Sequence, residues 1–393
     1  MTTGIEKINF FTPPYYIEMD DLAAARQIDP NKFKIGIGQD QMAVSPLPYD
    51  SVALAINAAM GLELSAADKH AIDTIILATE TGVDHSKAGS TWVHQALELP
   101  PYVRAVEMKQ ACYSATAALQ LALGHLQLHP DKKVLIIASD IANYGVKTAG
   151  EPTQGAGAVA ILLSNDAKIM QLETESMPYT REISDFWRPL YADVPFVDGK
   201  YSNEAYVKTF SGAWQGYKQL TGRIASDFDA LLFHVPYTKM GKKSLQALDE
   251  AGELTADLYD QFLAAYEKAT LYNRQVGNLY TGSLYLSLLS FLEHAQAAQA
   301  GELIGLFSYG SGAVGEFFAG KLLPDFEKYV HPARTQKLLA ARHRLPITTY
   351  ENLLSERITV DDAGNWQPDA TYIQPGDFVL QKITAHQRQY GRA

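Results

Sequence analysis

The chain has 393 residues, of which 47% are hydrophobic and 20% charged, as in a folded globular protein and unlike a disordered chain. Its formal net charge of −11 disfavours nucleic acid or an anionic membrane as a partner of the whole surface, although a local basic site for an anionic ligand is compatible with it. The single cysteine excludes an intramolecular disulfide and a four-cysteine metal site.

Targeting signals are missing from the N-terminal region. Residues Met1 to Tyr16 lack the basic start and the apolar run of a signal peptide. No uninterrupted apolar stretch is long enough to cross a bilayer, so we expect no membrane-spanning helix. A cytoplasmic location is the resulting expectation.

Short apolar runs alternate with longer helical stretches along the chain. The runs are continuous rather than alternating, as in strands that are buried on both faces. In chain order, the expected strands are Thr74–Ala78, Val134–Ala138, Ala158–Leu163, Ala230–Phe233 and Leu303–Phe307. The expected long helices are Ser114–Leu128 and Leu284–Ala300. This rhythm predicts an α/β fold with parallel sheet content.

A weak internal repeat indicates two related halves. The glycine-rich run 155–163 resembles the run 310–318, although glycine turns before strands also recur by chance. We predict an N-terminal half over residues 1–170 and a C-terminal half over residues 171–393. The segment 171–222, rich in Tyr, Trp, Pro and Asp, is predicted to be an insertion that lines a site, and the more polar chain from Pro324 onward a peripheral extension.

Cys112 is the first candidate for chemistry. It lies directly before the expected helix Ser114–Leu128, where unpaired backbone N–H groups and the helix dipole favour a thiolate. An inert buried cysteine is the alternative.

Glu80 follows the wholly apolar strand Thr74–Ala78, and partial desolvation there raises a carboxyl pKa toward a value useful for proton transfer. A helix cap or a surface glutamate is the alternative.

The second half offers similar residues at similar places. His234 ends the expected strand Ala230–Phe233, where an imidazole can act as an acid or base or polarise a carbonyl. Asn278 precedes the apolar helix of this half, as Cys112 does in the first half, although an asparagine there is also an ordinary helix N-cap. The turn Gly310–Gly312 can direct backbone N–H groups at an oxyanion.

Taken together, cysteine and histidine indicate acyl transfer, and the added carboxylate indicates removal of a proton from carbon or water. The histidines show no paired metal-ligand spacing, so no metal site is predicted. The lysines at 239, 242 and 243 usually mark a solvated face, but beside a strand end they can bind phosphates.

These motifs resemble the hydroxymethylglutaryl-CoA synthase family of bacterial type. The resemblance rests on Glu80-Thr-Gly, Gln110-Ala-Cys-Tyr-Ser-Ala-Thr, His234-Val-Pro-Tyr-Thr-Lys-Met-Gly-Lys-Lys, Val276-Gly-Asn-Leu-Tyr-Thr-Gly-Ser, the early run from Ile35 and Phe307-Ser-Tyr-Gly-Ser-Gly-Ala. It extends from about residue 5 to 320 and is weakest in the C-terminal tail. It implies a thiolase-like fold, with two similar halves in a layered αβαβα arrangement, and a homodimer.

The resemblance also implies residue roles. Cys112 takes the acetyl group from acetyl-CoA, and Glu80 removes a proton from its methyl group. The carbanion attacks the ketone of acetoacetyl-CoA, held by His234 and Asn278, and water then hydrolyses the enzyme thioester. Backbone N–H groups of Cys112 and Ser311 stabilise the oxyanion. The remaining implied residues are Asp140, Tyr144, Asp185 and Phe186 for the acyl pocket, and Lys239 and Lys243 for CoA.

The resemblance implies no metal or redox cofactor, and it implies that the product feeds the mevalonate pathway of isoprenoid synthesis.

Three related enzymes are alternatives. A ketoacyl synthase typically lacks a glutamate at position 80, and a thiolase needs a second active-site cysteine, which this chain lacks. A homologue that takes its acceptor from an acyl carrier protein stays open, since the sequence cannot reveal a basic groove for such a partner. A non-catalytic acyl-CoA-binding scaffold is the alternative outside enzymes.

Overall fold

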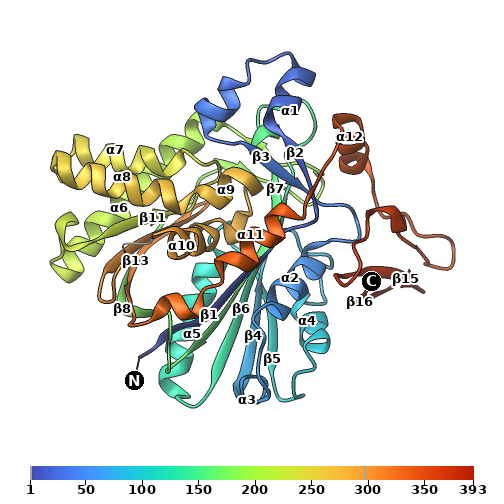
Figure 1. Cartoon of the computed structure of the whole chain (residues 1–393), viewed down its shortest axis with the longest axis horizontal. Coiled ribbons are helices and arrows are strands. Elements are labelled where there is room, and N and C mark those ends of the chain that lie inside the picture. Colours follow the sequence, from blue (N-terminus) through green and yellow to red (C-terminus); the bar gives the residue numbers. More distant parts are fainter. Residues whose placement is uncertain (1, 296–297) are drawn as a thin grey trace.

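One mixed sheet of nine strands forms the centre of the protein (Figure 1). The computed structural model describes residues 2–295 and 298–393. The strand order is β11-β12-β13-β8-β1-β7-β6-β4-β5. One part of the sheet therefore contains β5, β4, β6, β7 and β1, and the other part contains β8, β13, β12 and β11. The two parts meet where β1 pairs antiparallel with β8, and a side chain at Gly4 would stand 2.0 Å from the Met170 carbonyl oxygen. Only glycine permits this close approach.

The strands of this sheet are β1 (Gly4–Phe11), β4 (Ile72–Ala78), β5 (Arg104–Met108), β6 (Lys133–Ala142), β7 (Gly155–Ser164), β8 (Met170–Thr180), β11 (Ala230–Phe233), β12 (Leu303–Gly310) and β13 (Val314–Leu322). Pairing is parallel between β4 and both β5 and β6, and between β11 and β12, and is antiparallel elsewhere in the sheet.

Helices cover both faces of the sheet. Their bounds are α2 (Ser51–Met60), α3 (Ala66–Ala71), α4 (Ser90–Ala96), α5 (Ser114–Leu128), α6 (Gly199–Thr221), α7 (Met240–Glu250), α8 (Ala256–Ala269), α9 (Leu271–Val276) and α10 (Ser283–His294). In Figure 1, α2 and α4 lie on one side of β6 and β4, and α5 lies on the other. The buried hydroxyls of Thr116 in α5 and Tyr285 in α10, 2.8 Å apart, join the two inner helices.

Smaller elements surround this body. A three-stranded sheet contains β2 (Tyr15–Glu18), β3 (Gln41–Val44) and β14 (His343–Arg344), with α1 (Met19–Arg26) beside it. The C-terminal part comprises α11 (Pro332–Ala340), α12 (Ile347–Ser355) and the hairpin of β15 (Phe378–Thr384) and β16 (Gln387–Arg392). This hairpin and α12 lie at one edge of the molecule, coloured red in Figure 1.

The predicted α/β class and the five predicted strands are confirmed, and α5 has the predicted bounds. The predicted helix Leu284–Ala300 is too long: α10 ends at His294, Ala295 is its C-cap, and residues 296 and 297 lie outside the described residues. The predicted insertion at 171–222 also needs correction, because its first residues belong to β8, which pairs with β13 inside the sheet. The division into halves at residue 170 stays a prediction.

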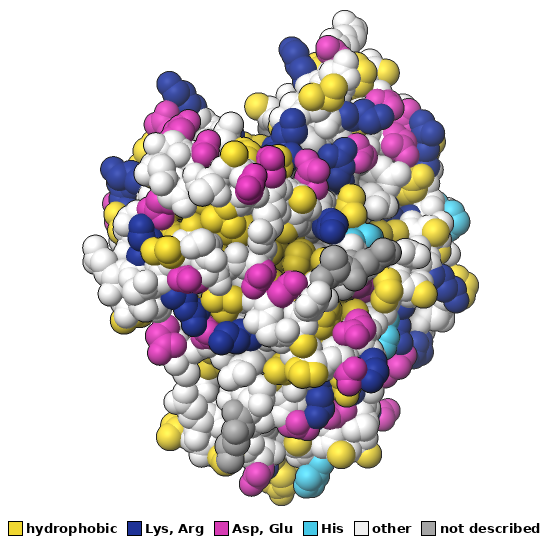
Figure 2. Space-filling model, turned by 60° about the vertical axis from the view of Figure 1, so that its left-hand side comes forward, with side chains coloured by type: hydrophobic (Ala, Val, Ile, Leu, Met, Phe, Trp, Pro, Cys, Tyr) yellow, Lys and Arg dark blue, Asp and Glu magenta, His cyan; other side chains and the backbone are white. Residues whose placement is uncertain are grey.

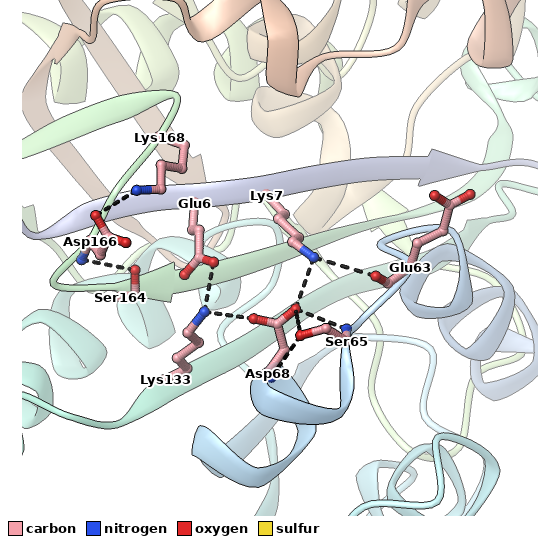
Figure 3. Close-up of polar contacts among 9 residues, drawn as sticks. All are labelled: Glu6, Lys7, Glu63, Ser65, Asp68, Lys133, Ser164, Asp166 and Lys168. Atoms are coloured by element: carbon pink, nitrogen blue, oxygen red, sulfur yellow. Dashed lines mark hydrogen bonds and ion pairs between the residues drawn. The ribbon is translucent and has the colours of Figure 1, made fainter.

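A charged network fastens the start of β6 to its neighbours (Figure 3). Lys133 donates to Glu6 and to Asp68, at 2.6 Å each, and Lys7 donates to the other oxygen of Asp68 at 2.9 Å. Asp68 also forms a capping box with Ser65 at the start of α3. Lys133 is the first residue of β6, and Asp140 lies near the other end of the same strand, ~23 Å away at the rise of a strand.

No helix among the described residues is long and apolar enough to cross a membrane.

Candidate active site

A sharp turn presents Cys112 between β5 and α5. Ala111 has a left-handed backbone with φ of 44°, a strained conformation for a residue with a side chain. Its carbonyl accepts a hydrogen bond of 2.8 Å from the Ser114 hydroxyl at the first turn of α5. Cys112 is left 9% exposed, at the edge of a small cluster with Ala142 and Tyr280. The predicted position at a helix N-terminus is confirmed.

Cys112 faces Glu80, which follows β4. The thiol donates to Oε1 of Glu80 across 3.3 Å. Burial, followed by the negative charge of Asp140, raises the pKa of Glu80 from 4.5 to about 8. Burial and the Glu80 carboxylate raise the pKa of Cys112 well above its usual value. The expected stabilisation of a thiolate by the helix is therefore overridden here, because the sulfur is buried beside an acidic group.

Asp140 holds the Glu80 turn from beneath. One oxygen accepts hydrogen bonds from the backbone N–H groups of Glu80 and Thr81, at 2.9 and 3.1 Å, and from two threonine hydroxyls. The other accepts from the N–H and the hydroxyl of Thr281, at 3.1 and 2.6 Å. Asp140 itself is fully buried at the end of β6. A single carboxylate thus connects the Glu80 turn with the segment that follows Asn278.

His234 lies directly after β11, as predicted. Its side chain is 2% exposed, its backbone N–H donates to Phe307 at 2.8 Å, and its carbonyl accepts from the Tyr206 hydroxyl at 2.6 Å. Burial lowers the pKa of His234 to about 3, so the imidazole is neutral near pH 7. Its Nδ1 atom is buried and has no hydrogen-bond partner among the described residues.

Asn278 lies in the connection between α9 and α10. Its carbonyl oxygen accepts from the Tyr280 N–H and the Ser283 hydroxyl, both at 2.8 Å, and its amide donates to the Tyr144 hydroxyl at 3.1 Å. The connection crosses β7 so closely that a side chain at Gly277 would stand 1.9 Å from the Gln154 carbonyl oxygen. The Asn278 side chain therefore accepts from the first residue of a short 3-10 turn, Tyr280–Gly282, whose N-cap is Leu279, and Asn278 lies ahead of α10 rather than at its start.

These residues surround a cavity of about 340 Å³, here named the Cys112 cavity. The predicted residues that line it are Cys112, Tyr144, Phe186, His234, Asn278 and Ser311. Its other walls are largely aromatic or apolar, and include Ile37, Tyr206, Met240, Tyr280 and Tyr309. Such a cavity, with few polar groups converging on one thiol, is suited to hold the acyl end of a thioester.

The predicted acyl-pocket residues divide into two groups. Tyr144 and Phe186 are wall residues, with ring centroids 5.8 Å apart. Asp140 and Asp185 are not among the lining residues; they are buried behind the wall. Asp185 accepts from the Tyr309 hydroxyl at 2.7 Å and from the Gly312 N–H at 2.9 Å, so it fixes both sides of the turn that contains Ser311.

The turn with Ser311 lies against the segment that carries Cys112. A side chain at Gly310 would stand 2.6 Å from the Gln110 carbonyl oxygen and from the Tyr113 Cβ, which leaves glycine as the fitting residue. Lys239 and Lys243 are half-buried at the start of α7, and Lys243 stands 5.7 Å over the ring of Tyr237, a wall residue of the Cys112 cavity. Both lysines are therefore close to the cavity without lining it.

Comparisons with known proteins show the family of this chain. The family models described as hydroxymethylglutaryl-coenzyme A synthase N terminal and C terminal match residues 1–168 and residues 172–251 and 250–393. The chain belongs to this family. A hydroxymethylglutaryl-CoA synthase of Enterococcus faecalis is 50% identical over 361 residues, which cover 92% of this chain and 94% of that protein.

Two further comparisons test the fold and the subfamily. A crystal structure of an HMG-CoA synthase complexed with CoA superposes with a TM-score of 0.96, at 43% identity and full coverage of both chains. A polyketide biosynthesis 3-hydroxy-3-methylglutaryl-ACP synthase of Bacillus subtilis is 32% identical, over 90% of this chain and 88% of that protein. The predicted family and thiolase-like fold are confirmed.

Several residues of the site were not predicted. Tyr206 in α6, Tyr280 and Tyr309 build much of the wall of the Cys112 cavity. Tyr280 and Tyr309 lie inside the motifs that contain Asn278 and Ser311, and an aromatic residue two positions from each is the signal that indicates them. Arg188 donates to the Glu80 carbonyl at 2.6 Å, and no local pattern indicated this. No group of three or more His, Cys, Asp or Glu side chains that could hold a metal is found among residues 2–295 and 298–393.

Proposed function

We propose that this protein is an acyltransferase that condenses acetyl-CoA with acetoacetyl-CoA and water to give 3-hydroxy-3-methylglutaryl-CoA and CoA. The observation that carries the proposal is the 3.3 Å contact between the Cys112 thiol and the Glu80 carboxyl, beside a cavity lined by His234 and Asn278. A nucleophile and a base in contact can attach an acyl group and then deprotonate it.

In the first step, the Cys112 sulfur attacks the thioester carbon of acetyl-CoA. Because the thiol is buried, its proton leaves as the new C–S bond forms. The thiolate of CoA departs and takes up the proton that Cys112 released, so Glu80 stays free to act as the base of the next step. The backbone N–H groups of Cys112 and Ser311 are the proposed donors to the carbonyl oxygen, which becomes negative during the attack.

In the second step, Glu80 removes a proton from the methyl group of acetyl-Cys112. A base with a pKa of about 8 is better matched to a weak carbon acid than an ordinary carboxylate, provided that it is held against the methyl group. The acetylated sulfur of Cys112 carries no charge, so it does not compete with Glu80 for the methyl proton. The carbon nucleophile attacks the ketone carbon of acetoacetyl-CoA, and Glu80 returns the proton to the resulting alkoxide.

His234 and Asn278 are the proposed anchors of the acetoacetyl group. With a pKa of about 3, His234 acts as a neutral hydrogen-bond donor to the ketone oxygen rather than as an imidazolium acid. The amide of Asn278, which reaches Tyr144 at 3.1 Å, can donate to the same acyl group. Water then hydrolyses the Cys112 thioester and frees the thiol. Thiol, carboxyl and neutral imidazole supply these steps, so we propose no metal or redox cofactor.

The remaining assignments follow from the family. Lys239 and Lys243, beside the cavity, are proposed to meet the phosphates of CoA. A cytoplasmic location and a role in the mevalonate pathway are proposed on the same ground. A homodimer is supported by apolar side chains left exposed at and near the sheet edge, namely Tyr102, Val106, Leu121 and Leu128.

The carrier-protein alternative deserves a separate test. One relative is named a 3-hydroxy-3-methylglutaryl-ACP synthase, but its identity of 32% is lower than the 50% shared with the CoA enzyme. Figure 2 shows Lys and Arg side chains interspersed with Asp and Glu on the face toward α7 and α8, rather than a continuous basic groove.

The buried Cys112–Glu80 contact favours an enzyme over an acyl-CoA-binding scaffold, because binding alone does not require a thiol beside a carboxyl group.

The test is to mix the purified protein with acetyl-CoA and acetoacetyl-CoA and to follow the products by mass spectrometry. We expect 3-hydroxy-3-methylglutaryl-CoA that depends on both substrates. Acetylated Cys112 without this product would instead indicate another acceptor, first of all one attached to a carrier protein. If neither acetylation nor product is observed, the proposal is contradicted and the scaffold alternative returns.

A further inference from the structure

A second and wider cavity reaches the catalytic pair from the other side. It has a volume of about 880 Å³ and is lined by Glu80, Lys109 and Arg188, among others; we name it the Glu80 cavity. Cys112 is a lining residue of the Cys112 cavity, and Glu80 of the Glu80 cavity, although their side chains are 3.3 Å apart. Phe186 and Ser311 line both cavities and thus form the partition between them.

The walls of the two cavities differ in chemistry. The Cys112 cavity is walled mainly by aromatic and apolar side chains. The Glu80 cavity is bordered by charged side chains, among them Asp84, Lys87 and Glu107, and several of its residues are exposed. Water fills an open, charged cavity more readily than an aromatic one. The Glu80 cavity therefore brings water to the turn that carries Glu80, whose partly buried carboxyl lies beside the Cys112 thiol.

The proposed reaction, on which this inference depends, creates a problem of access for its last step. After condensation, the product is bound twice: one end is a thioester of Cys112, and the other end is still attached to CoA. The CoA arm then occupies the Cys112 cavity, through which the acceptor entered. Water that must attack the Cys112 thioester cannot pass along the same aromatic walls.

We infer that the Glu80 cavity is the water route for hydrolysis of the enzyme thioester, and that substrate and water approach Cys112 from opposite sides of Phe186 and Ser311. Glu80, having returned its proton to the alkoxide, is again a base. It takes a proton from a water molecule as the water oxygen bonds to the thioester carbon. The C–S bond breaks, the Cys112 sulfur receives that proton from Glu80, and the product leaves with a carboxylate and one released proton.

The partition is held by contacts on both sides. Arg188, in the turn after strand β9 (Phe186–Trp187), donates to the Glu80 carbonyl at 2.6 Å. Asp185, directly before β9, accepts from the Gly312 N–H at 2.9 Å. These two bonds fix Phe186 between the cavities, where its ring lies 5.9 Å from that of Tyr280. The Arg188 contact also fixes the Glu80 turn at the edge of the Glu80 cavity.

The test measures loss of the acetyl group from acetyl-Cys112 by intact mass, with and without desulfo-CoA. Desulfo-CoA lacks the thiol, so it can fill the Cys112 cavity without taking the acetyl group back. In the wild-type protein we expect hydrolysis to stay within about twofold when desulfo-CoA is saturating. A loss of about tenfold or more would mean that water uses the Cys112 cavity, and would overturn the inference.

The second arm narrows the Glu80 cavity with Ala88→Trp and Ala192→Trp, at two lining positions that belong to different segments. We expect hydrolysis to fall about tenfold or more, with the acetylation rate within about twofold of wild type. Gln246→Trp, at an exposed position of α7, is the matched control and should change neither rate. Unchanged hydrolysis in the double variant would overturn the inference.

The two arms separate this inference from the proposed function. A wild-type protein that is never acetylated contradicts the proposed function itself. A wild-type protein that is acetylated and forms product, but whose hydrolysis desulfo-CoA stops, contradicts only the water route. If the double variant fails to fold, seen as loss of acetylation, each single variant and the wild-type arm still decide the question.

Discussion

Asp140 at the end of β6 accepts two hydrogen bonds from Thr281, one from its N–H at 3.1 Å and one from its hydroxyl at 2.6 Å. Its other oxygen accepts the N–H of Glu80 at 2.9 Å. Glu80, the proposed base, and the segment that follows Asn278 are therefore held by one buried carboxylate. Its charge also helps to raise the pKa of Glu80.

Replacing this carboxylate should change both stability and pH dependence. In Asp140→Asn, amide hydrogens face buried N–H donors, and the free energy of unfolding should fall by about 1–3 kcal/mol. Loss of the negative charge should also lower the pKa of Glu80, so the rise of condensation rate with pH should move to lower pH. Denaturant unfolding and a pH profile measure the two effects. Asp166→Asn, at an exposed turn, is the control; a pH profile that does not move would contradict this electrostatic role.

Glu80 should make the folded state less stable as pH rises. Its pKa is raised from 4.5 to about 8 on folding, so below pH 4.5 the carboxyl is neutral in both states and costs nothing. Between 4.5 and about 8 the unfolded chain ionises first, and the stability associated with the neutral folded form is lost progressively. Glu80→Gln, which cannot ionise, should gain stability relative to wild type across this window.

Denaturant unfolding of both proteins at about pH 5 and about pH 8.5 would measure the difference. The variant should be favoured more at the higher pH. Equal differences at both values would show that the carboxyl is not desolvated as described.

His234 should matter as a neutral hydrogen-bond donor. His234→Ala should slow condensation by about 10²-fold, the usual effect of removing one oxyanion donor, and should leave acetylation of Cys112 largely intact. Because the pKa of His234 is lowered to about 3, the wild-type rate should show no inflection near pH 6.5 from this residue. Rapid-quench kinetics separate the two steps. His129→Ala, with an exposed imidazole, is the control. If His234→Ala loses acetylation instead of condensation, His234 acts in the first step and the proposed role is wrong.

The sequence predicted those parts of the site that depend on local order. Apolar runs located the ends of β4 and β11, and therefore Glu80 and His234, because strand ends carry site residues in such sheets. The helix after Cys112 was predicted with its observed bounds, since its small and apolar residues form one continuous pattern. The resemblance to a family supplied the roles, which residue types alone could not assign.

Contacts between distant segments could not be predicted in this way. Asp140 was expected at the acyl pocket, but it lies behind the wall, and its hydrogen bonds to Thr81 and Thr281 connect residues far apart in the chain. Arg188 reaches the Glu80 carbonyl from more than a hundred positions away. The helix Leu284–Ala300 was predicted too long because Ala and Gln continue a helical pattern beyond His294 without a glycine or proline to end it.

The most direct test of the mechanism is the intact mass of Glu80→Ala after mixing with acetyl-CoA and then acetoacetyl-CoA. Removing the carboxyl also removes a group that raises the pKa of Cys112, so the thiol should still be acetylated. Without the base, the acetyl methyl group should keep its proton, and no 3-hydroxy-3-methylglutaryl-CoA should form. An acetylated variant that forms product at the wild-type rate, or a folded variant that cannot be acetylated, would contradict the assignment of Glu80 as the carbon base.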